Sequence, residues 1–191
     1  ANCFALSEAL DGAGKGYGIV FGVIMGTGVG GGIVINGQLC PGRQHICGEW
    51  GHNILEVDGP DCYCGQKGCV ETLISGPGLA GDFYRSGGNS VLTASDIVLQ
   101  AAQGNSVAEV TMQRFFDRFG RALATVVNIL DPDVIVLGGG LSKIERLYSE
   151  GREKVAQYVF NDQLITPILQ NLHGDSSGVR GAAQLWEVSE L

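Results

Sequence analysis

Residues 17–37, YGIVFGVIMGTGVGGGIVING, decide the fold. The first part, residues 17–25, is rich in aromatic and β-branched residues and is typical of a buried strand. The glycine-rich residues 26–32 predict a turn. Residues 32–35 then predict a second strand, which ends at Asn36-Gly37, a hairpin signal. The stretch therefore predicts two antiparallel strands joined across a glycine loop.

Glycine is unusually frequent in the whole chain. There are 31 glycines among 191 residues, more than twice the average usage of about 7%. They cluster at residues 12–18, 26–32 and 138–140 without a collagen-like period. With 45% hydrophobic and 17% charged residues, the composition is globular and not disordered. Glycine clusters beside hydrophobic runs indicate a backbone that approaches a ligand closely.

Charge and hydropathy exclude several classes of protein. The net charge of −8 lacks the positive footprint of a nucleic-acid-binding surface, so no nucleic-acid partner is expected for this part. No apolar run reaches the length of about 18 residues that a membrane span needs. The start at Ala1 shows neither a signal peptide nor an initiator Met, so we expect a cytoplasmic protein whose chain is processed or part of a longer one.

The rest of the chain alternates between helical and strand patterns, which predicts an α/β fold with mixed strands. The clearest helix is 106–130, where apolar residues recur every three or four positions. Its Phe115, Phe116 and Phe119 favour a core helix over a subunit contact. Strands or extended pieces are expected at 134–137 and 165–172. Further helices are expected at 1–10, at 70–85 with a break near Gly76-Pro77, after a cap at 93–96, and at 142–160 and 182–187.

His52, Cys62, Cys64 and Cys69 form a candidate metal site. One imidazole and three thiolates make a closed tetrahedral set, which suits structural Zn²⁺ better than a catalytic metal with an open position. Gly65 and Gly68 allow the turn that brings Cys69 back, and the metal would stabilise a loop that has little else to hold it. Free thiols or one disulfide are the alternatives. Cys47 is a rival ligand, whereas Cys3 and Cys40 are expected in the core.

Two glycine loops are candidates for nucleotide binding. Residues 26–32 lack the Gly-Lys-Ser/Thr of a P-loop and precede a strand, unlike a dinucleotide fingerprint. Their backbone N–H groups and the Thr27 hydroxyl can still bind phosphate. Residues 138–142 link a buried strand to a predicted helix, where a nucleotide can be accommodated. A bulged hairpin and a tight strand-to-helix turn are the structural alternatives.

Glu49 and Glu71 flank the candidate metal loop. Together with His52 they offer acceptors for several vicinal hydroxyls, as a polyol or a sugar requires. The alternative is two solvated surface acids, which is the usual place of Glu. No convincing general base for phosphoryl transfer is found: Asp131 and Asp133 read as helix-stop and strand-start residues, and Asp11 lies in a glycine loop.

Taken together, the motifs resemble the ROK family of kinases, open reading frames and repressors. The resemblance covers nearly the whole chain in family order, and the Cys/His motif carries most of its specificity. The residues within these motifs are most similar to those of fructokinase and mannokinase members, and N-acetylglucosamine kinases are second. The matching stretches are ANCFALSEA, GTGVGGG, GEWGH, CYCGQKGCVET, NILDPDVIVLGGGLS and HGDSSGVRGAA.

The resemblance implies an actin-like, ribonuclease-H-like ATPase fold in two lobes, of which residues 1–191 are the C-terminal lobe with a zinc- and sugar-binding loop at 45–72. It implies ATP and Mg²⁺, a hexose phosphorylated on its 6-hydroxyl, and a homodimer. Glu49, His52 and Glu71 would bind sugar hydroxyls, and His52 would also share Zn²⁺ with Cys62, Cys64 and Cys69. Gly26, Thr27 and Gly28 would line the ATP phosphates, and Gly139 and Gly140 the adenosine.

The sequence departs from the family pattern at its start. Family members carry an N-terminal lobe with an Asp-x-Gly-Gly-Thr phosphate loop, and an Asn-Asp pair directly before the position of Ala1. That Asp is the family's catalytic base, so no catalytic residue is expected within this chain and the fragment alone is expected to be inactive. Two other functions stay open: the C-terminal part of a ROK transcriptional repressor, and a zinc-stabilised module that binds a partner without catalysis.

Overall fold

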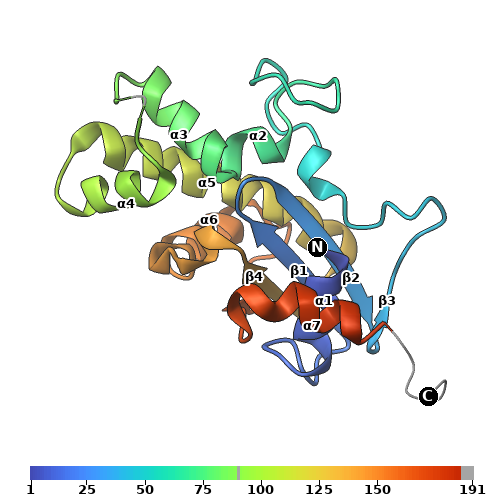
Figure 1. The fold of residues 1–191 in the computed structure, drawn as a ribbon. Coiled ribbons are helices and arrows are strands. Elements are labelled where there is room, and N and C mark those ends of the chain that lie inside the picture. The colour runs from blue at the N-terminus through green and yellow to red at the C-terminus, as the bar shows by residue number, and fades with distance from the viewer. Residues whose placement is uncertain (90, 186–191) are drawn as a thin grey trace.

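The strands β1 (Ile19–Met25) and β2 (Val29–Ile35) form an antiparallel hairpin at the centre of the molecule (Figure 1). This is a computed structural model, and it describes residues 1–89 and 91–185. The expected pairing of the two strands is confirmed. The connecting turn, however, covers only residues 26–28, because residues 30–32 pair with β1 as part of β2. The predicted turn over 26–32 was therefore too long.

The hairpin belongs to a mixed five-stranded sheet in the order β3-β2-β1-β4-β5. β4 (Val134–Gly138) lies parallel to β1, and β5 (Ile168–Gln170) lies parallel to β4. β3 (Gln38–Leu39) pairs antiparallel with β2. Asn36 and Gly37 make the turn between β2 and β3 with φ values of 51° and 77°, as their sequence indicates.

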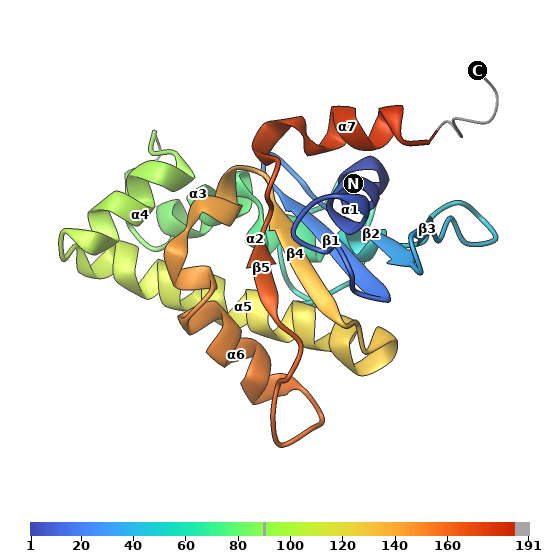
Figure 2. The same ribbon diagram turned by 90° about the horizontal axis from the view of Figure 1, so that it is seen from below.

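Helices cover both faces of the sheet (Figure 2). α1 (Asn2–Leu10) and α7 (Ser177–Ala183) lie on one face, whereas α5 (Ser106–Leu130) and α6 (Glu150–Tyr158) lie on the other. Side chains of β1 alternate between the two cores: Val20 packs with the residues of α1, and Phe21 and Val23 pack with those of α5. This alternation is the one expected of a strand that is buried on both faces.

Glycines in β1 and β2 allow α1 to lie close to the sheet. Gly22 and Gly32 are paired across the hairpin. A Cβ on either would lie 2.7–2.8 Å from Ala5. In the same way, a Cβ on Gly138 would lie 2.3 Å from the ring of Phe4. These three glycines therefore serve helix packing, whereas the sequence had assigned Gly32 and Gly138 to ligand-binding loops.

The remaining helices pack around α5, whose 25 residues make it the longest element. α2 (Val70–Ile74) and α3 (Gly76–Arg85) are separated at Ser75, close to the break expected at Gly76-Pro77. α4 (Ala94–Ala102) begins with the capping box expected at Thr93 and Asp96. Phe115, Phe116 and Phe119 are at most 1% exposed, so these residues of α5 belong to the core and form no subunit contact.

Two predicted helices differ from the structure. In place of a helix over 142–160, the 3₁₀ turns Gly140–Lys143 and Glu145–Leu147 precede α6. The Ser142 hydroxyl donates to the Gly139 carbonyl at 2.7 Å, and the Tyr148 hydroxyl donates to the Ser142 carbonyl at the same distance. These side-chain bonds occupy backbone acceptors that an α-helix would use.

The last helix begins earlier than expected. α7 starts at Ser177 instead of residue 182, and residues 186–187 of the predicted helix lie outside the described residues. A Cβ on Gly181 would lie 1.6 Å from the Cys3 carbonyl oxygen, so α7 packs directly on the backbone of α1. In the described part of the chain, every helix is too short or too polar to cross a membrane.

Candidate functional site

The structure brings the four predicted metal ligands together. One ligand atom each from His52, Cys62, Cys64 and Cys69 lies within 4.8 Å of all the others. Cys62 Sγ is 3.5 Å from His52 Nδ1, and Cys64 Sγ is 3.6 Å from Cys69 Sγ. Ligands at zinc–sulfur distances of about 2.3 Å in a tetrahedron are about 3.8 Å apart. The donor set and its spacing therefore fit Zn²⁺.

The rival ligand Cys47 lies outside this cluster. Its Sγ is 3.5 Å from Cys40 Sγ, and both thiols are half-buried. The expectation that Cys3 and Cys40 are ordinary core residues is met only in part, since both are half-buried. All six cysteines have free thiols in the structure.

Glycines and backbone hydrogen bonds fold the loop around the cluster. Gly65 and Gly68 have φ values of 91° and 63°, which L-residues with side chains rarely adopt. A Cβ on Gly68 would lie 1.5 Å from the Glu56 carbonyl oxygen. The Cys62 N–H donates to the Gln66 carbonyl at 2.8 Å, which closes the turn that contains Cys64. The tight turn expected from the glycine positions is thus present.

The thiols of the cluster differ in acidity. Burial raises the pKa of Cys69 to about 12. The pKa of the exposed Cys64 is lowered to about 7, chiefly by a hydrogen bond from the Gln66 backbone. A bound dication favours the thiolate at both positions, since metal ligation displaces the thiol proton.

An ionic contact joins the loop to α5. Arg118 Nε donates to Glu56 Oε1 at 2.8 Å, and Arg121 donates to the same oxygen at 3.0 Å. Burial opposes ionisation of Glu56, but the two guanidinium groups outweigh it and hold the pKa of this carboxyl below its usual value. Arg118 also lies 3.1 Å from Asp82 of α3. The metal loop is therefore fixed to two helices of the large core.

The hydroxyl of Tyr63 contacts one of the predicted sugar-binding residues, His52, and is influenced by the charges of the other two. His52 Nε2 lies 2.9 Å from this hydroxyl. The negative charge of Glu71, burial, and the charges of Cys62 and Glu49 raise the pKa of Tyr63. Glu71 Oε2 also accepts a hydrogen bond from the Val29 backbone N–H at 2.9 Å. Glu49, His52 and Glu71 thus share one region, and Glu71 reaches the start of β2.

The two glycine loops meet at one cavity. A cavity of about 550 Å³ is lined by Gly26 and Thr27 from the β1–β2 turn and by Gly140 from the turn after β4. Gly139, with φ of 79°, lies against the Met25 backbone: a Cβ there would be 2.4 Å from the Met25 oxygen. Gly28 is not among the residues that line this cavity. It faces Glu71, since a Cβ on Gly28 would lie 2.4 Å from Glu71 Oε2.

Sequence reasoning missed part of this lining. Gly76 and Pro77 at the N-terminus of α3 border the same cavity, as do Thr93 and Ser95 before and within α4. A helix N-terminus that faces a cavity favours an anion. The sequence shows the helix-start signals at Pro77 and Thr93. No local sequence pattern indicates that these two helix starts lie beside the glycine turns. Tyr63 was missed for the same reason.

Comparison with known proteins places the chain. A model of the ROK family matches residues 1–189, and the chain therefore belongs to the ROK family. An N-acetyl-D-glucosamine kinase from Yersinia pseudotuberculosis serotype O:1b is 41% identical to it over 97% of this chain. The chain spans 64% of the length of that relative.

Solved structures agree with this assignment. A ROK hexokinase from Thermus thermophilus superposes with a TM-score of 0.88 at 31% identity, over 97% of this chain and 62% of that one. A ROK family glucokinase from Streptomyces griseus, in complex with glucose and AMPPNP, gives a TM-score of 0.87 at 29% identity, over 97% and 65%. The expected actin-like ATPase fold of the ROK kinases is thus confirmed.

Proposed function

We propose that the chain is the C-terminal lobe of an ATP-dependent hexose kinase that transfers the γ-phosphoryl group of ATP to the 6-hydroxyl of the sugar. The observation that carries this proposal is the placement of two predicted ligand sets on neighbouring sides of the β1–β2 turn. Gly26 and Thr27 line the cavity on one side of it. Glu71 bonds the backbone at its other end. A phosphate donor and a hydroxyl acceptor bound at these two places would lie close to each other.

The residues divide into three roles. Gly26, Thr27 and Gly140 would hold the nucleotide with Mg²⁺, where bare backbone and the N-terminus of α3 suit phosphate. Glu49, His52 and Glu71 would orient the sugar by accepting from or donating to its hydroxyls. The Cβ position of Gly28 lies beside Glu71 and that of Gly139 beside the Met25 backbone, so these two predicted ATP-binding residues would act on the nucleotide through their neighbours. By the resemblance to the family, the base that deprotonates the acceptor would lie in the part of the relatives that this chain does not cover.

The acceptor is proposed from the relatives. The residues of the sequence motifs favour fructose or mannose as the acceptor sugar, with N-acetylglucosamine second. The Yersinia relative is named an N-acetyl-D-glucosamine kinase, and the two structures are named a hexokinase and a glucokinase. We therefore propose N-acetylglucosamine as the preferred hexose, with fructose as the acceptor to compare.

The test is a coupled assay of ADP release with the protein in its full natural length. N-acetylglucosamine, glucose, mannose and fructose are offered in turn. We expect ADP release that depends on the hexose, and a large loss on substitution of Glu71→Gln but not of the exposed Glu153→Gln. Sugar binding without ADP release would favour the repressor hypothesis, and binding of neither sugar nor nucleotide would favour the non-catalytic module. The 191-residue chain alone is expected to be inactive in the same assay.

A structural zinc ion is the proposed metal. Support comes from the fit of the cluster to tetrahedral spacing and from the burial of Cys69, since a bound dication favours the thiolate at a buried position. The test is metal analysis of the purified protein. We expect one zinc per chain, and substitution of Cys64→Ser should lower the zinc content and the melting temperature together. The matched control is Cys3→Ser, and a metal-free protein of unchanged stability would contradict the proposal.

A homodimer is also proposed. Supporting residues are exposed apolar side chains at the end of α5 and in the loop after β3, among them Ile129 at 87% and Ile46 at 59% exposure. With Phe115, Phe116 and Phe119 in the core, these positions are the better candidates for a contact. Light scattering after size-exclusion chromatography measures the mass, and a monomer at micromolar concentration would contradict the proposal.

A further inference from the structure

Tyr63 makes a contact that its exposure does not explain. Its side chain lies in the metal loop between two cysteine ligands, and the residue is 84% exposed. Even so, its hydroxyl is 2.9 Å from His52 Nε2, and its ring stands edge-on to the imidazole, with centroids 5.1 Å apart. The hydroxyl and the ring of Tyr63 thus both contact the imidazole of His52.

The contact uses the only ring nitrogen of His52 that remains available. His52 Nδ1 faces the cluster, 3.5 Å from Cys62 Sγ. A histidine whose Nδ1 ligates a metal carries its proton on Nε2. The Nε2–H group then donates to the Tyr63 hydroxyl. The hydrogen bond that the proposed function reserves for a sugar hydroxyl is therefore made within the chain.

A cavity lies beside Tyr63, at a position where a sugar could bind. Tyr63 borders a cavity of about 280 Å³ together with Glu71 and Thr27, which are the proposed sugar-binding and phosphate-facing residues. A tyrosine phenol is neutral at neutral pH, so its hydroxyl can donate and accept hydrogen bonds as a sugar hydroxyl does.

We propose that Tyr63 caps the sugar site: its hydroxyl occupies the His52 Nε2 position when no sugar is bound, and an incoming hexose hydroxyl displaces it. This inference rests on the proposed function. Tyr63 then competes with the substrate for His52 Nε2 and has no part in the phosphoryl transfer itself. Displacement of the Tyr63 hydroxyl is fast, because an exposed side chain changes rotamer within nanoseconds.

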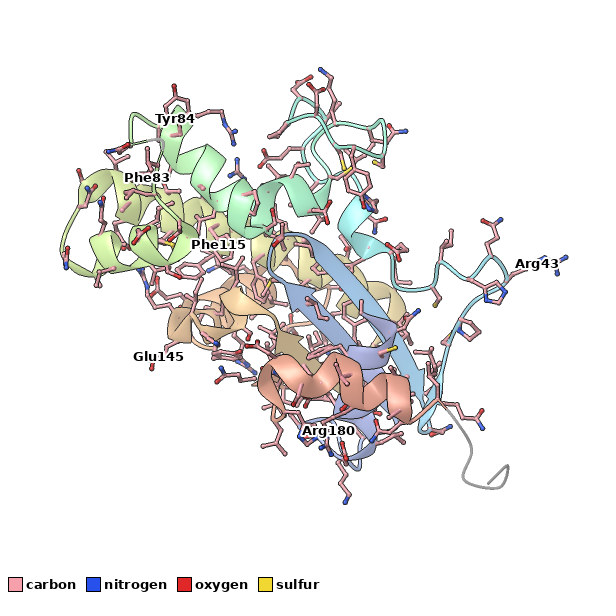
Figure 3. The ribbon with its side chains drawn as sticks, in the orientation of Figure 1. Arg43, Phe83, Tyr84, Phe115, Glu145 and Arg180 are labelled. Carbon is pink, nitrogen blue, oxygen red and sulfur yellow. The ribbon has the colours of Figure 1, made fainter. Side chains whose placement is uncertain are left out.

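The test compares Tyr63→Phe with the wild type in the full-length, zinc-loaded protein. Phenylalanine keeps the ring contact and removes only the hydroxyl. We expect the sugar Kd from calorimetry and the KM to fall by about two- to tenfold, the effect of one neutral hydrogen bond, with kcat unchanged. Tyr84→Phe is the matched control, since Tyr84 is an exposed tyrosine that projects from α3 (Figure 3). A Kd that is unchanged or higher in Tyr63→Phe would overturn the cap.

A second measurement separates the cap from the function on which it rests. The ¹⁵N signal of His52 Nε2 should shift in sugar-free Tyr63→Phe, and hexose added to the wild type should also shift it. If the sugar-free signal is the same in both proteins, the Tyr63 contact does not exist and the cap is wrong, even when the kinase is active. If no hexose binds either protein although the sugar-free signals differ, the proposed sugar site fails and the displacement fails with it.

Discussion

Glu8 offers a stringent test of how the C-terminal helix is held. Its carboxylate is fully buried. Oε2 accepts from the backbone N–H groups of Ala13 and Leu172 at 2.9 and 3.0 Å. Oε1 accepts from the His173 N–H at 3.2 Å and the Ser177 hydroxyl at 2.7 Å. One side chain of α1 thus fixes the segment that leads into α7.

The substitution Glu8→Gln measures this contribution with almost no change in shape. The glutamine amide keeps one acceptor oxygen and turns an NH₂ group toward the remaining donors. The Ser177 hydroxyl can rotate to accept, but the His173 N–H loses its partner. An unsatisfied buried donor costs about 1–3 kcal/mol, and the other bonds lose their charge-assisted part, so we expect about 3 kcal/mol in total. For a chain of this size the melting temperature falls by about 6–12 °C.

The pH dependence gives a second signature. Burial opposes ionisation of Glu8, but the hydrogen bonds from Leu172, Ala13, Ser177 and His173 outweigh it and lower the pKa below its usual value of 4.5. A depressed pKa in the folded state stabilises the protein above pH 4.5, and this stability is lost as the pH falls through the folded value. The difference between wild type and Glu8→Gln should therefore be constant near neutral pH and shrink below pH 4.5.

Thermal unfolding followed by circular dichroism gives the melting temperatures, and hydrogen exchange of the α7 amides reports local release of the helix. Glu153→Gln is the control, because Glu153 is exposed on α6. The Arg180 guanidinium, which reaches from α7 to Asp11 (Figure 3), is kept in both variants. A melting temperature of Glu8→Gln within about 1 °C of the wild type at pH 7 would refute the reasoning, since it is far below the shift expected.

Two further predictions follow from packing and charge. Gly28→Ala places a methyl group 2.4 Å from Glu71 Oε2. The carboxylate must move away and lose its hydrogen bond from the Val29 N–H, at a cost of about 0.5–1.5 kcal/mol. Gly26→Ala meets no heavy atom within 4 Å and should leave the thermal stability unchanged, so equal melting temperatures for both variants would contradict this. Arg118→Ala removes a largely buried partner of two carboxylates and should destabilise the protein by about 3 kcal/mol in urea unfolding. Arg43→Ala, at the exposed tip of the loop after β3 (Figure 3), is its control and should match the wild type.

The sequence predicted those parts of the fold whose signals are local. α5 follows from hydrophobic periodicity, β1 and β4 follow from short apolar runs rich in β-branched residues, and α4 follows from its capping box. The helix expected over 142–160 failed because the decisive interaction, from the Tyr148 hydroxyl to the Ser142 carbonyl, depends on side-chain geometry that periodicity does not encode. The glycine cluster at 26–32 was read as one loop because the approach of Ala5 to Gly32 joins residues far apart in sequence.

The site shows the same division. The Cys/His cluster was predictable because Cys62, Cys64 and Cys69 lie close together in sequence and their spacing is itself a geometric constraint. The proposed fourth ligand, His52, lies close enough to the cysteines in the sequence to be recognised as part of the same motif. The cavity lining from Pro77 and Thr93 was not predictable, since these positions meet the glycine turns only through the packing of α3 and α4.

Glu71 shows why the metal loop matters beyond its own stability. Cys69, a residue of the cluster, occupies the N-cap position of α2, so the cluster fixes where the first turn of that helix begins. Glu71 lies in that turn, and its Oε2 holds the Val29 N–H at the start of β2. The turn that ends there contains Thr27, which lines the large cavity. Because the chain of contacts is continuous, disorder of the cluster displaces the carboxylate, and the β1–β2 turn loses a hydrogen bond that fixes its shape. The proposed zinc ligands would therefore act on both proposed ligand sites through one carboxylate, although none of these four residues is among those lining the cavity of about 550 Å³.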